Sequence, residues 1–210
     1  IIYLVYIMLN NVQVKDLASR MGIRLEAVCF KSELKEMKLK HNVAYIINLE
    51  DEYDEDGNPN DGSHYVCFQY NKYPKNGCRD EYCYFDSFGI APPDEILKFC
   101  NVKEMPHSII DIQSLMNNAC GFYCLAFLYY INVCPYRTMD FYRDCETFTS
   151  LFHDLNKTTN WKENEYVLKL FFKSKDSKPT TLEDIGFTFT PSGTNIAAGI
   201  ADINSIDSEV

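Results

Sequence analysis

Positive charge is scarce in this chain. Its 210 residues include 20 Lys and Arg against 30 Asp and Glu, which gives a formal net charge of -10. This is the wrong sign for a protein whose principal partner is a phosphate backbone, so we expect no nucleic-acid partner. The densest group of lysines is interpreted as the solvated face of a helix, and it comprises Lys31, Lys35, Lys38 and Lys40.

We also expect no membrane span and no secretion signal. The charge-free stretch from Ala119 to Cys134 is shorter than the roughly 20 apolar residues that a spanning helix needs. The apolar start, Ile1 to Leu9, lacks a basic lead, so we expect it to pack as a first element and not to act as a signal or an anchor. Nine cysteines without such a signal indicate reduced thiols.

The chain also lacks a strong metal-binding spacing. Cys67, Cys78 and Cys83 could be combined into a zinc set, but their spacing matches no established pattern, and Cys67 and Cys83 fall on strand-like runs. We therefore interpret them as structural cysteines and expect no metal and no cofactor. A zinc-binding structural protein stays open as an alternative.

Apolar and aromatic residues are plentiful. The hydrophobic content is 46%, with 15 Tyr and 14 Phe, and the length suits one domain. Aromatic residues become rare after Ser174, where polar and acidic residues take over. We therefore predict a globular domain over residues 1–173 and a flexible acidic tail over residues 174–210.

One apolar helix organises the chain. The apolar positions from Ala119 to Cys134 run round every face of a helix, which predicts burial on all sides. Cys120 falls in the first turn, after the cap-competent Asn117 and Asn118. Unpaired N–H groups and the positive end of the helix dipole favour a thiolate at this position, so Cys120 is the candidate nucleophile.

A thiolate nucleophile needs a base and a group that orients the base. His64 opens one alternating run and Asp86 ends the next, with turn residues at 71–80 between them. If the two runs are antiparallel neighbours, both side chains lie at one end of a sheet, facing the start of the helix. Gln113 can donate its amide to the oxyanion of a tetrahedral intermediate, beside the Cys120 N–H. Three other histidines are rival bases, namely His41, His107 and His153.

The remaining pattern predicts the scaffold. We expect a first strand at Val43–Leu49, an exposed acidic loop at Glu50–Gly62, and a strand at Ser108–Gln113 that delivers Gln113. Helices are predicted at Val12–Met21, Ser32–Lys40, Ala91–Phe99, Thr138–Leu155 and Trp161–Lys173.

The order of these motifs resembles the adenain-like cysteine proteases, which are the adenovirus maturation protease and its relatives in virophages and Polinton (Maverick) elements. The resemblance is carried by Gly-x-His-Tyr at 62–65, Tyr-Phe-Asp-Ser-Phe-Gly at 84–89 and Gln-x6-Cys-Gly at 113–121. It spans roughly Val43 to Val133, and it implies the same four roles: His64 as base, Asp86 as its orienter, Gln113 as oxyanion donor and Cys120 as nucleophile.

Two positions depart from the pattern of the family and its relatives. Tyr65 stands where the family often has Trp, which keeps an aromatic residue beside the base. Ala119 stands where the related SUMO-specific proteases usually place Asp. The second departure points towards the viral branch.

The resemblance also implies a fold and a function. The fold would be a single α+β domain, in which a mixed or antiparallel sheet packs against the Cys120 helix with other helices around it. The substrates would be capsid precursor proteins, cut after Gly in small-residue sites, in the host cytoplasm or the virion. Adenovirus protease uses DNA as a cofactor, but the net charge of -10 predicts that this chain does not. A deubiquitinase or SUMO-type protease, and a catalytically silent binding module, stay open as alternatives.

The predicted tail contains a small-residue sequence of the kind that the family cuts. Ile196-Ala197-Ala198-Gly199-Ile200 places an aliphatic residue three positions before a glycine. One hypothesis is that the enzyme binds or trims its own tail after Gly199. The simpler interpretation is an uninvolved tail.

Overall fold

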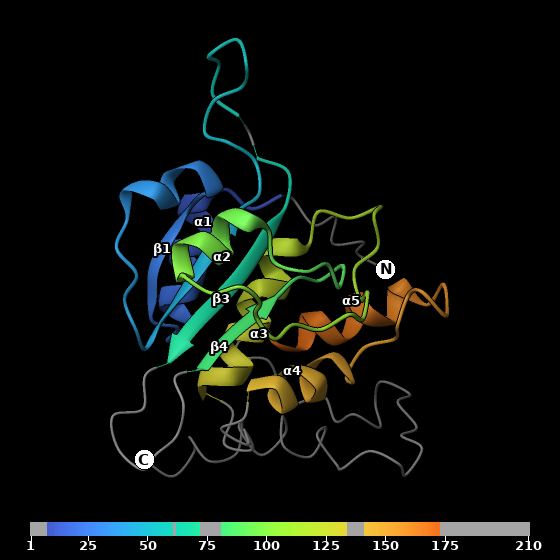
Figure 1. The fold of residues 1–210 in the computed structure, drawn as a ribbon. Helices are drawn as coiled ribbons and strands as arrows, with labels where there is room; N and C mark the ends of the chain where they lie inside the picture. Colours follow the sequence, from blue (N-terminus) through green and yellow to red (C-terminus); the bar gives the residue numbers. More distant parts are fainter. Residues whose placement is uncertain (1–7, 61, 72–80, 134–140, 173–210) are drawn as a thin grey trace, which may run out of the picture.

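The computed structural model describes residues 8–60, 62–71, 81–133 and 141–172. Nearly all of the predicted turn at 71–80, and the whole predicted tail with its Gly199 sequence, lie outside these residues. Within them the fold is α+β, as the sequence predicts, with a mixed four-stranded sheet and several helices (Figure 1).

The four strands lie in the sheet in the order in which they occur along the chain. They are β1 (Leu25–Phe30), β2 (Val43–Asn48), β3 (Tyr65–Asn71) and β4 (Glu81–Phe85). β1 and β2 are parallel, whereas β2–β3 and β3–β4 are antiparallel. All six residues of β2 are buried, because its alternating side chains enter a core on each face of the sheet.

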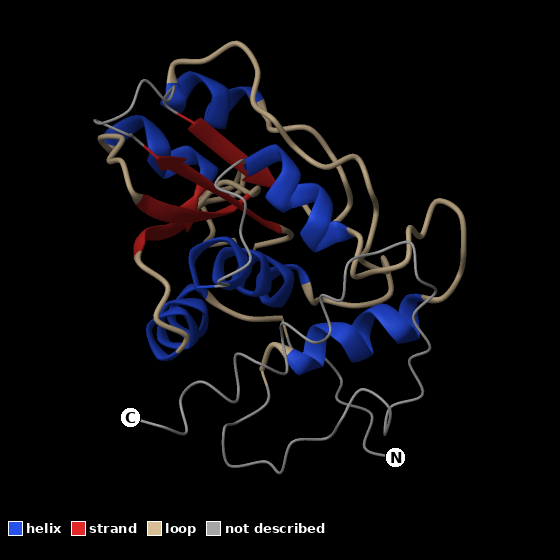
Figure 2. Cartoon of the chain, turned by 90° about the horizontal axis from the view of Figure 1, so that it is seen from below, coloured by secondary structure: helices blue, strands red, loops and turns tan. Residues whose placement is uncertain are grey.

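Helices cover both faces of this sheet (Figure 2). On one face lies a larger core that the sheet shares with α1 (Asn11–Arg20), α3 (Cys120–Val133), α4 (Phe141–Thr149) and α5 (Trp161–Leu170). On the other face, a smaller core lies under the 3-10 helix η1 (Lys31–Glu36) and α2 (Asp94–Cys100).

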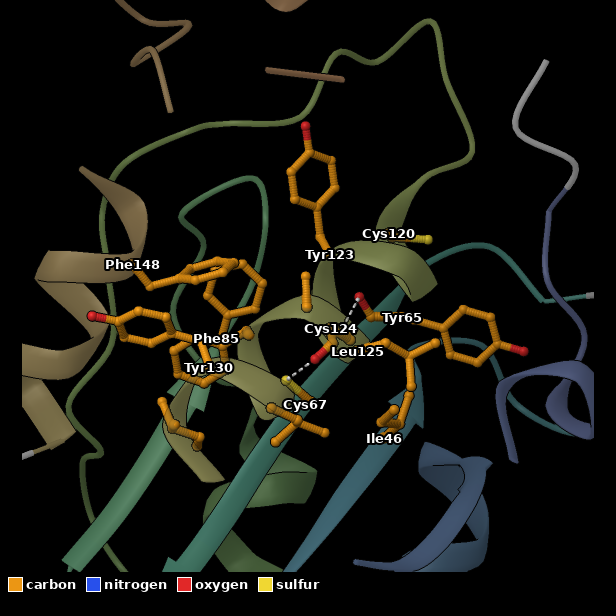
Figure 3. Close-up of a cluster of buried hydrophobic side chains, with 14 of the residues drawn as sticks. Ile46, Tyr65, Cys67, Phe85, Cys120, Tyr123, Cys124, Leu125, Tyr130 and Phe148 are labelled. Carbon is orange, nitrogen blue, oxygen red and sulfur yellow. Dashed lines mark hydrogen bonds between the residues drawn. The ribbon is translucent and has the colours of Figure 1, made fainter. Parts of the chain in front are cut away.

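The central helix α3 is buried on all sides, which confirms the prediction from its apolar pattern. Every residue from Tyr123 to Leu128 is fully buried. Phe85 of β4 stacks on Phe127 of α3 with ring centroids 4.5 Å apart, and Phe148 of α4 meets both rings edge-on, so that aromatic rings join sheet and helices (Figure 3). Each fully buried ring contributes about 1.5–3 kcal/mol of apolar burial.

The N-terminal helix α1 begins and ends one residue earlier than the predicted helix Val12–Met21. It begins with a capping box, in which Asn10 and Gln13 exchange side-chain and backbone hydrogen bonds of 2.9 Å. It ends before Gly22, whose φ of +71° is the left-handed conformation that terminates helices. Among the described helices, none is both long and apolar enough to cross a bilayer.

Three predictions about the scaffold are wrong. Val43–Asn48 is the second strand, because Leu25–Phe30 pairs in parallel with it as an edge strand. Only Val28 and Cys29 of that edge strand are buried, so it shows no alternating pattern. The predicted helix at Ser32–Lys40 is only the short 3-10 helix Lys31–Glu36.

The third wrong prediction concerns Ser108–Gln113, which forms no strand. Its backbone runs beside the residues that follow β4, and the N–H groups of Ile112 and Gln113 both donate to the one carbonyl oxygen of Ser87. Two donors on a single acceptor cannot continue a strand ladder, in which successive groups alternate in direction. The segment is therefore a loop, and its backbone is hydrogen-bonded to Ser87, which follows β4.

Gly89 permits the close approach of that loop. Its φ is +69°, and a Cβ added there would lie 2.6 Å from the carbonyl carbon of Ile109. Gly57 is a matched control, since its φ is +81° but nothing lies within 4 Å of an added Cβ. We expect Gly57→Ala to lower the free energy of unfolding by the left-handed cost of about 1–2 kcal/mol, and Gly89→Ala by clearly more. Urea unfolding measures both, and equal losses would contradict this account of Gly89.

Candidate active site

The structure brings His64 and Asp86 together at one end of the sheet. His64 directly precedes β3 and Asp86 directly follows β4, so antiparallel pairing places them at the same end. His64 Nε2 lies 2.9 Å from Asp86 Oδ1. The histidine side chain is 14% exposed and the aspartate side chain is fully buried, so the imidazole remains reachable while its partner does not.

Further contacts hold this pair in place. The backbone N–H of Phe88 donates to Asp86 Oδ1 over 2.8 Å, and the Phe88 ring lies against the imidazole with centroids 4.7 Å apart. Asp86 Oδ2 is buried and has no hydrogen-bond partner among the described residues. Positive charge on His64 is therefore the main compensation for burying this carboxylate.

Asn48 positions the backbone that carries His64. Its side-chain Oδ1 accepts the N–H groups of Glu50 and Ser63, over 3.0 and 3.2 Å, and so closes the base of the exposed acidic loop. The Leu49 N–H donates to the His64 carbonyl oxygen over 2.8 Å. Sequence reasoning missed Asn48, because its partners lie across a loop and leave no local pattern.

Cys120 is the first residue of α3 and is 2% exposed. Ala119, and not one of the predicted asparagines, is the N-cap residue, since its carbonyl oxygen accepts the Tyr123 N–H over 3.0 Å. The N–H of Ala119 donates to Asn117 Oδ1 over 3.3 Å. The Cys120 N–H itself has no acceptor among the described residues. A backbone donor at a helix start is thus available beside the sulfur.

Close packing fixes where this helix begins. A Cβ added to Gly121 would meet Leu9 at 3.3 Å and Tyr65 at 3.4 Å. Tyr65 is the residue after His64, so the absence of a side chain at Gly121 lets the start of the helix lie against the strand that follows the base. Cys120 and Tyr65 accordingly lie near each other in Figure 3.

The electrostatics favour a charged His64. Burial by itself lowers the pKa of the imidazole, but the hydrogen bond and the negative charge of Asp86, together with the proximity of Cys120, outweigh burial and raise the pKa to about 9. At neutral pH the imidazole is then protonated and pairs with the Asp86 carboxylate.

Five other cysteines of the described residues are less suited to be nucleophiles. Burial raises the pKa of Cys29, Cys100 and Cys145 to about 12. Burial also raises the pKa of Cys83 and Cys124 well above the ordinary value. These thiols stay protonated at neutral pH, and a thiol is a much weaker nucleophile than a thiolate.

Gln113 lies in the loop that leads to Cys120 and is 2% exposed. Its Oε1 accepts a hydrogen bond from Ser87 Oγ over 2.7 Å, and its Nε2 donates to the Asn117 carbonyl oxygen over 3.1 Å. An amide nitrogen carries two hydrogens, and the second has no acceptor among the described residues. Gln113 therefore retains one donor for a ligand.

The rival histidines have other partners. His107 Nδ1 lies 3.0 Å from the Met105 carbonyl oxygen, and His153 Nε2 lies 2.6 Å from Glu163 Oε2. The ring of His41 lies 6.3 Å from that of Tyr70. Cys120 is among the groups that raise the pKa of His64.

No group of three potential metal ligands occurs within the described parts of the chain. Cys67 and Cys83, two members of the hypothetical zinc set, are buried in the larger core, while Cys78 lies outside the described residues. Two surface hollows of about 430 and 420 Å³ lie beside η1, and none of the four candidate site residues lines either of them.

No protein-family model matches the chain, and no curated protein matches it in sequence. The assignment of a function therefore depends on the geometry of the four residues and on the order of their motifs.

The raised pKa of His64 can be measured directly. Because the value of about 9 lies above the ordinary 6.5, the interactions of His64 stabilise the fold fully below pH 6.5, and this contribution is lost as the pH rises through about 9. Asp86→Asn removes the carboxylate charge and should lower the pKa by about 1–3 units.

Histidine ring NMR over a pH series gives these values, with His64 assigned through His64→Gln. Asp94→Asn is the control, since Asp94 is an exposed aspartate that lies on α2. An unchanged His64 pKa in Asp86→Asn would contradict the proposed ion pair.

Proposed function

We propose that the chain is a cysteine endopeptidase of the adenain-like type, with Cys120 as nucleophile, His64 as acid and base, Asp86 as the orienter of His64, and Gln113 as an oxyanion donor. The observation that carries this proposal is the position of His64 between a buried carboxylate and the cysteine at the start of α3. The second support is the order of the motifs, which resembles that of the family from roughly Val43 to Val133.

The chemistry follows from these positions. The Cys120 thiolate attacks the carbonyl carbon of the scissile peptide bond, a C–S bond forms, and the carbonyl π electrons move to the oxygen. The free N–H of Cys120 and the second N–H of Gln113 are the donors that stabilise this oxyanion.

His64 then returns a proton. The imidazolium protonates the amine nitrogen, the C–N bond breaks, and a thioester remains on Cys120. Neutral His64 next removes a proton from water, whose oxygen attacks the thioester carbonyl and releases the acid product and the thiolate. The buried Asp86 carboxylate holds the ring orientation and stabilises its charge in each half of the cycle.

The proposed substrates are polypeptides, in particular capsid precursors of a virus or a virus-like element, cut after Gly within small-residue sites. This part of the proposal is supported by the resemblance of the motifs to the adenain-like proteases. The proposed setting is the host cytoplasm or the virion, where reduced thiols are expected to persist.

Selective reaction of Cys120 tests the nucleophile. We expect brief iodoacetamide treatment near neutral pH to modify Cys120 well before Cys124, because Cys120 lies at a helix start beside an imidazolium, whereas the pKa of Cys124 is well above its ordinary value. Peptide mass spectrometry measures the order of modification.

The same material tests the activity. Wild-type protein should cut a peptide library that contains small-residue glycine sites and ubiquitin-like precursor junctions, while Cys120→Ala should not. Preferential labelling of another cysteine, or equal cleavage by Cys120→Ala, would refute the assignment. Cleavage confined to the ubiquitin-like junctions would favour the SUMO-type alternative.

Loss of the Gln113 amide should affect turnover more than binding. Removing one oxyanion donor costs on the order of 10² to 10³ in kcat, so we expect a fall of that size in Gln113→Ala with little change in KM. Steady-state kinetics on the best library peptide measure it. A fall of less than about fivefold would mean that Gln113 is not a principal oxyanion donor.

A further inference from the structure

Ser87 lies at the junction between the base and the oxyanion donor. It directly follows Asp86, it is fully buried, and its carbonyl oxygen accepts the N–H groups of Ile112 and Gln113 over 2.9 and 3.2 Å. Its side-chain hydroxyl lies 2.7 Å from Gln113 Oε1. One residue therefore holds both the backbone and the side chain of Gln113.

The hydrogen-bond network determines which way the Gln113 amide faces. The Asn117 carbonyl oxygen can only accept, so the amide atom 3.1 Å from it must be the nitrogen. The oxygen of the amide then faces Ser87, and the Ser87 hydroxyl must donate to it. The two contacts leave a single orientation, with the nitrogen on the side of the loop that leads to Cys120.

The backbone before Gln113 is held independently of Ser87's hydroxyl. The Ile112 carbonyl oxygen accepts from the Tyr123 hydroxyl over 3.0 Å and from Asn164 Nδ2 over 2.9 Å. Tyr123 belongs to α3 and Asn164 to α5, so two helices support this backbone. Loss of the Ser87 hydroxyl alone would leave the loop in place and release only the amide.

We propose that Ser87 is the positioning residue of the oxyanion donor, which holds the Gln113 amide with its nitrogen towards the nucleophile. This inference rests on the proposed function. In it, Asp86 and Ser87 have separate tasks at adjacent positions: the aspartate orients His64, and the serine orients Gln113. Without the hydroxyl, Gln113 Oε1 is buried without a donor, and the amide swings to find another partner.

A peptide aldehyde that ends in glycinal is a suitable probe. The Cys120 thiolate adds to its aldehyde carbon, a C–S bond forms, and the C=O π electrons become a lone pair on an oxygen that occupies the oxyanion site. Iodoacetamide is the matched probe, because displacement of iodide creates no oxyanion. Aldehyde binding therefore depends on the oxyanion donors, whereas the reaction with iodoacetamide depends only on the thiolate.

Ser87→Ala should weaken aldehyde binding about tenfold, as expected for one well-placed neutral hydrogen bond. The rate of iodoacetamide reaction at Cys120, and its dependence on pH, should stay within about twofold, because His64 and Asp86 are untouched. Ser108→Ala is the control: Ser108 is a buried serine of the neighbouring loop whose hydroxyl accepts from the Ile110 N–H over 3.1 Å. It should leave both readouts unchanged.

A double-mutant cycle separates positioning from general damage. If Ser87 acts through Gln113, then Ser87→Ala should weaken aldehyde binding no further in a Gln113→Ala background. The inference would be overturned if the two substitutions weakened aldehyde binding by the product of their separate factors. It would also be overturned if Ser87→Ala slowed the iodoacetamide reaction as much as it weakened aldehyde binding, or if Ser87→Ala bound the aldehyde as tightly as the wild type. Ser87→Thr, which retains the donor, should bind the aldehyde more tightly than Ser87→Ala.

The proposed function fails in a different way. If wild-type Cys120 reacts with iodoacetamide but forms no adduct with the aldehyde, then no oxyanion site exists, and both proposals are wrong. If the wild type binds the aldehyde and only the Ser87 variants behave otherwise than expected, the endopeptidase proposal stands and the role of Ser87 is refuted.

Discussion

Burial of α3 is the constraint on which the rest of the structure depends. An uncharged helix that is apolar on every face must be covered on every face, and here the sheet covers one side while α1, α4 and α5 cover the others. Four backbone N–H groups at the start of such a helix have no partners within it. Asn117 satisfies that of Ala119, and the N–H of Cys120 is left available beside the thiol. Because neighbouring elements cover the sides of the helix, the groups that remain available for a reaction lie at its N-terminal end.

The β3–β4 pair supplies the second half of the site at the same place. Antiparallel strands bring the residue before one and the residue after the other to a common end, and these residues are His64 and Asp86. Burying a carboxylate is costly unless it is paired, so the charge of the imidazolium and the Phe88 N–H both stabilise Asp86. The same pairing raises the His64 pKa, and in the proposed mechanism the imidazolium supplies the proton of the leaving amine.

The short segment after β4 joins the two halves of the site, which are the start of α3 and the end of the β3–β4 pair. Asp86 contacts the base, Ser87 contacts Gln113, and Gly89 allows the Ile109 backbone to lie against this segment. Such close approach of backbones explains why the motif ends in glycine. A displacement of this segment would disturb the orientation of the base and of the oxyanion donor together.

The sequence by itself determined the parts of this protein that depend on local periodicity. The all-round apolar pattern predicts the buried helix of Cys120, and the alternation at His64–Tyr70 and Glu81–Phe88 predicts the strand pair that joins His64 to Asp86. Only the tertiary structure decided how the remaining elements pair. The edge strand Leu25–Phe30 has too few buried residues to show a period, and Ser108–Gln113 reads as a strand although its hydrogen bonds converge on one carbonyl oxygen. The positioning contacts of Asn48 and Ser87 were likewise out of reach, because a hydrogen bond between residues distant in the chain leaves no periodic trace in the sequence.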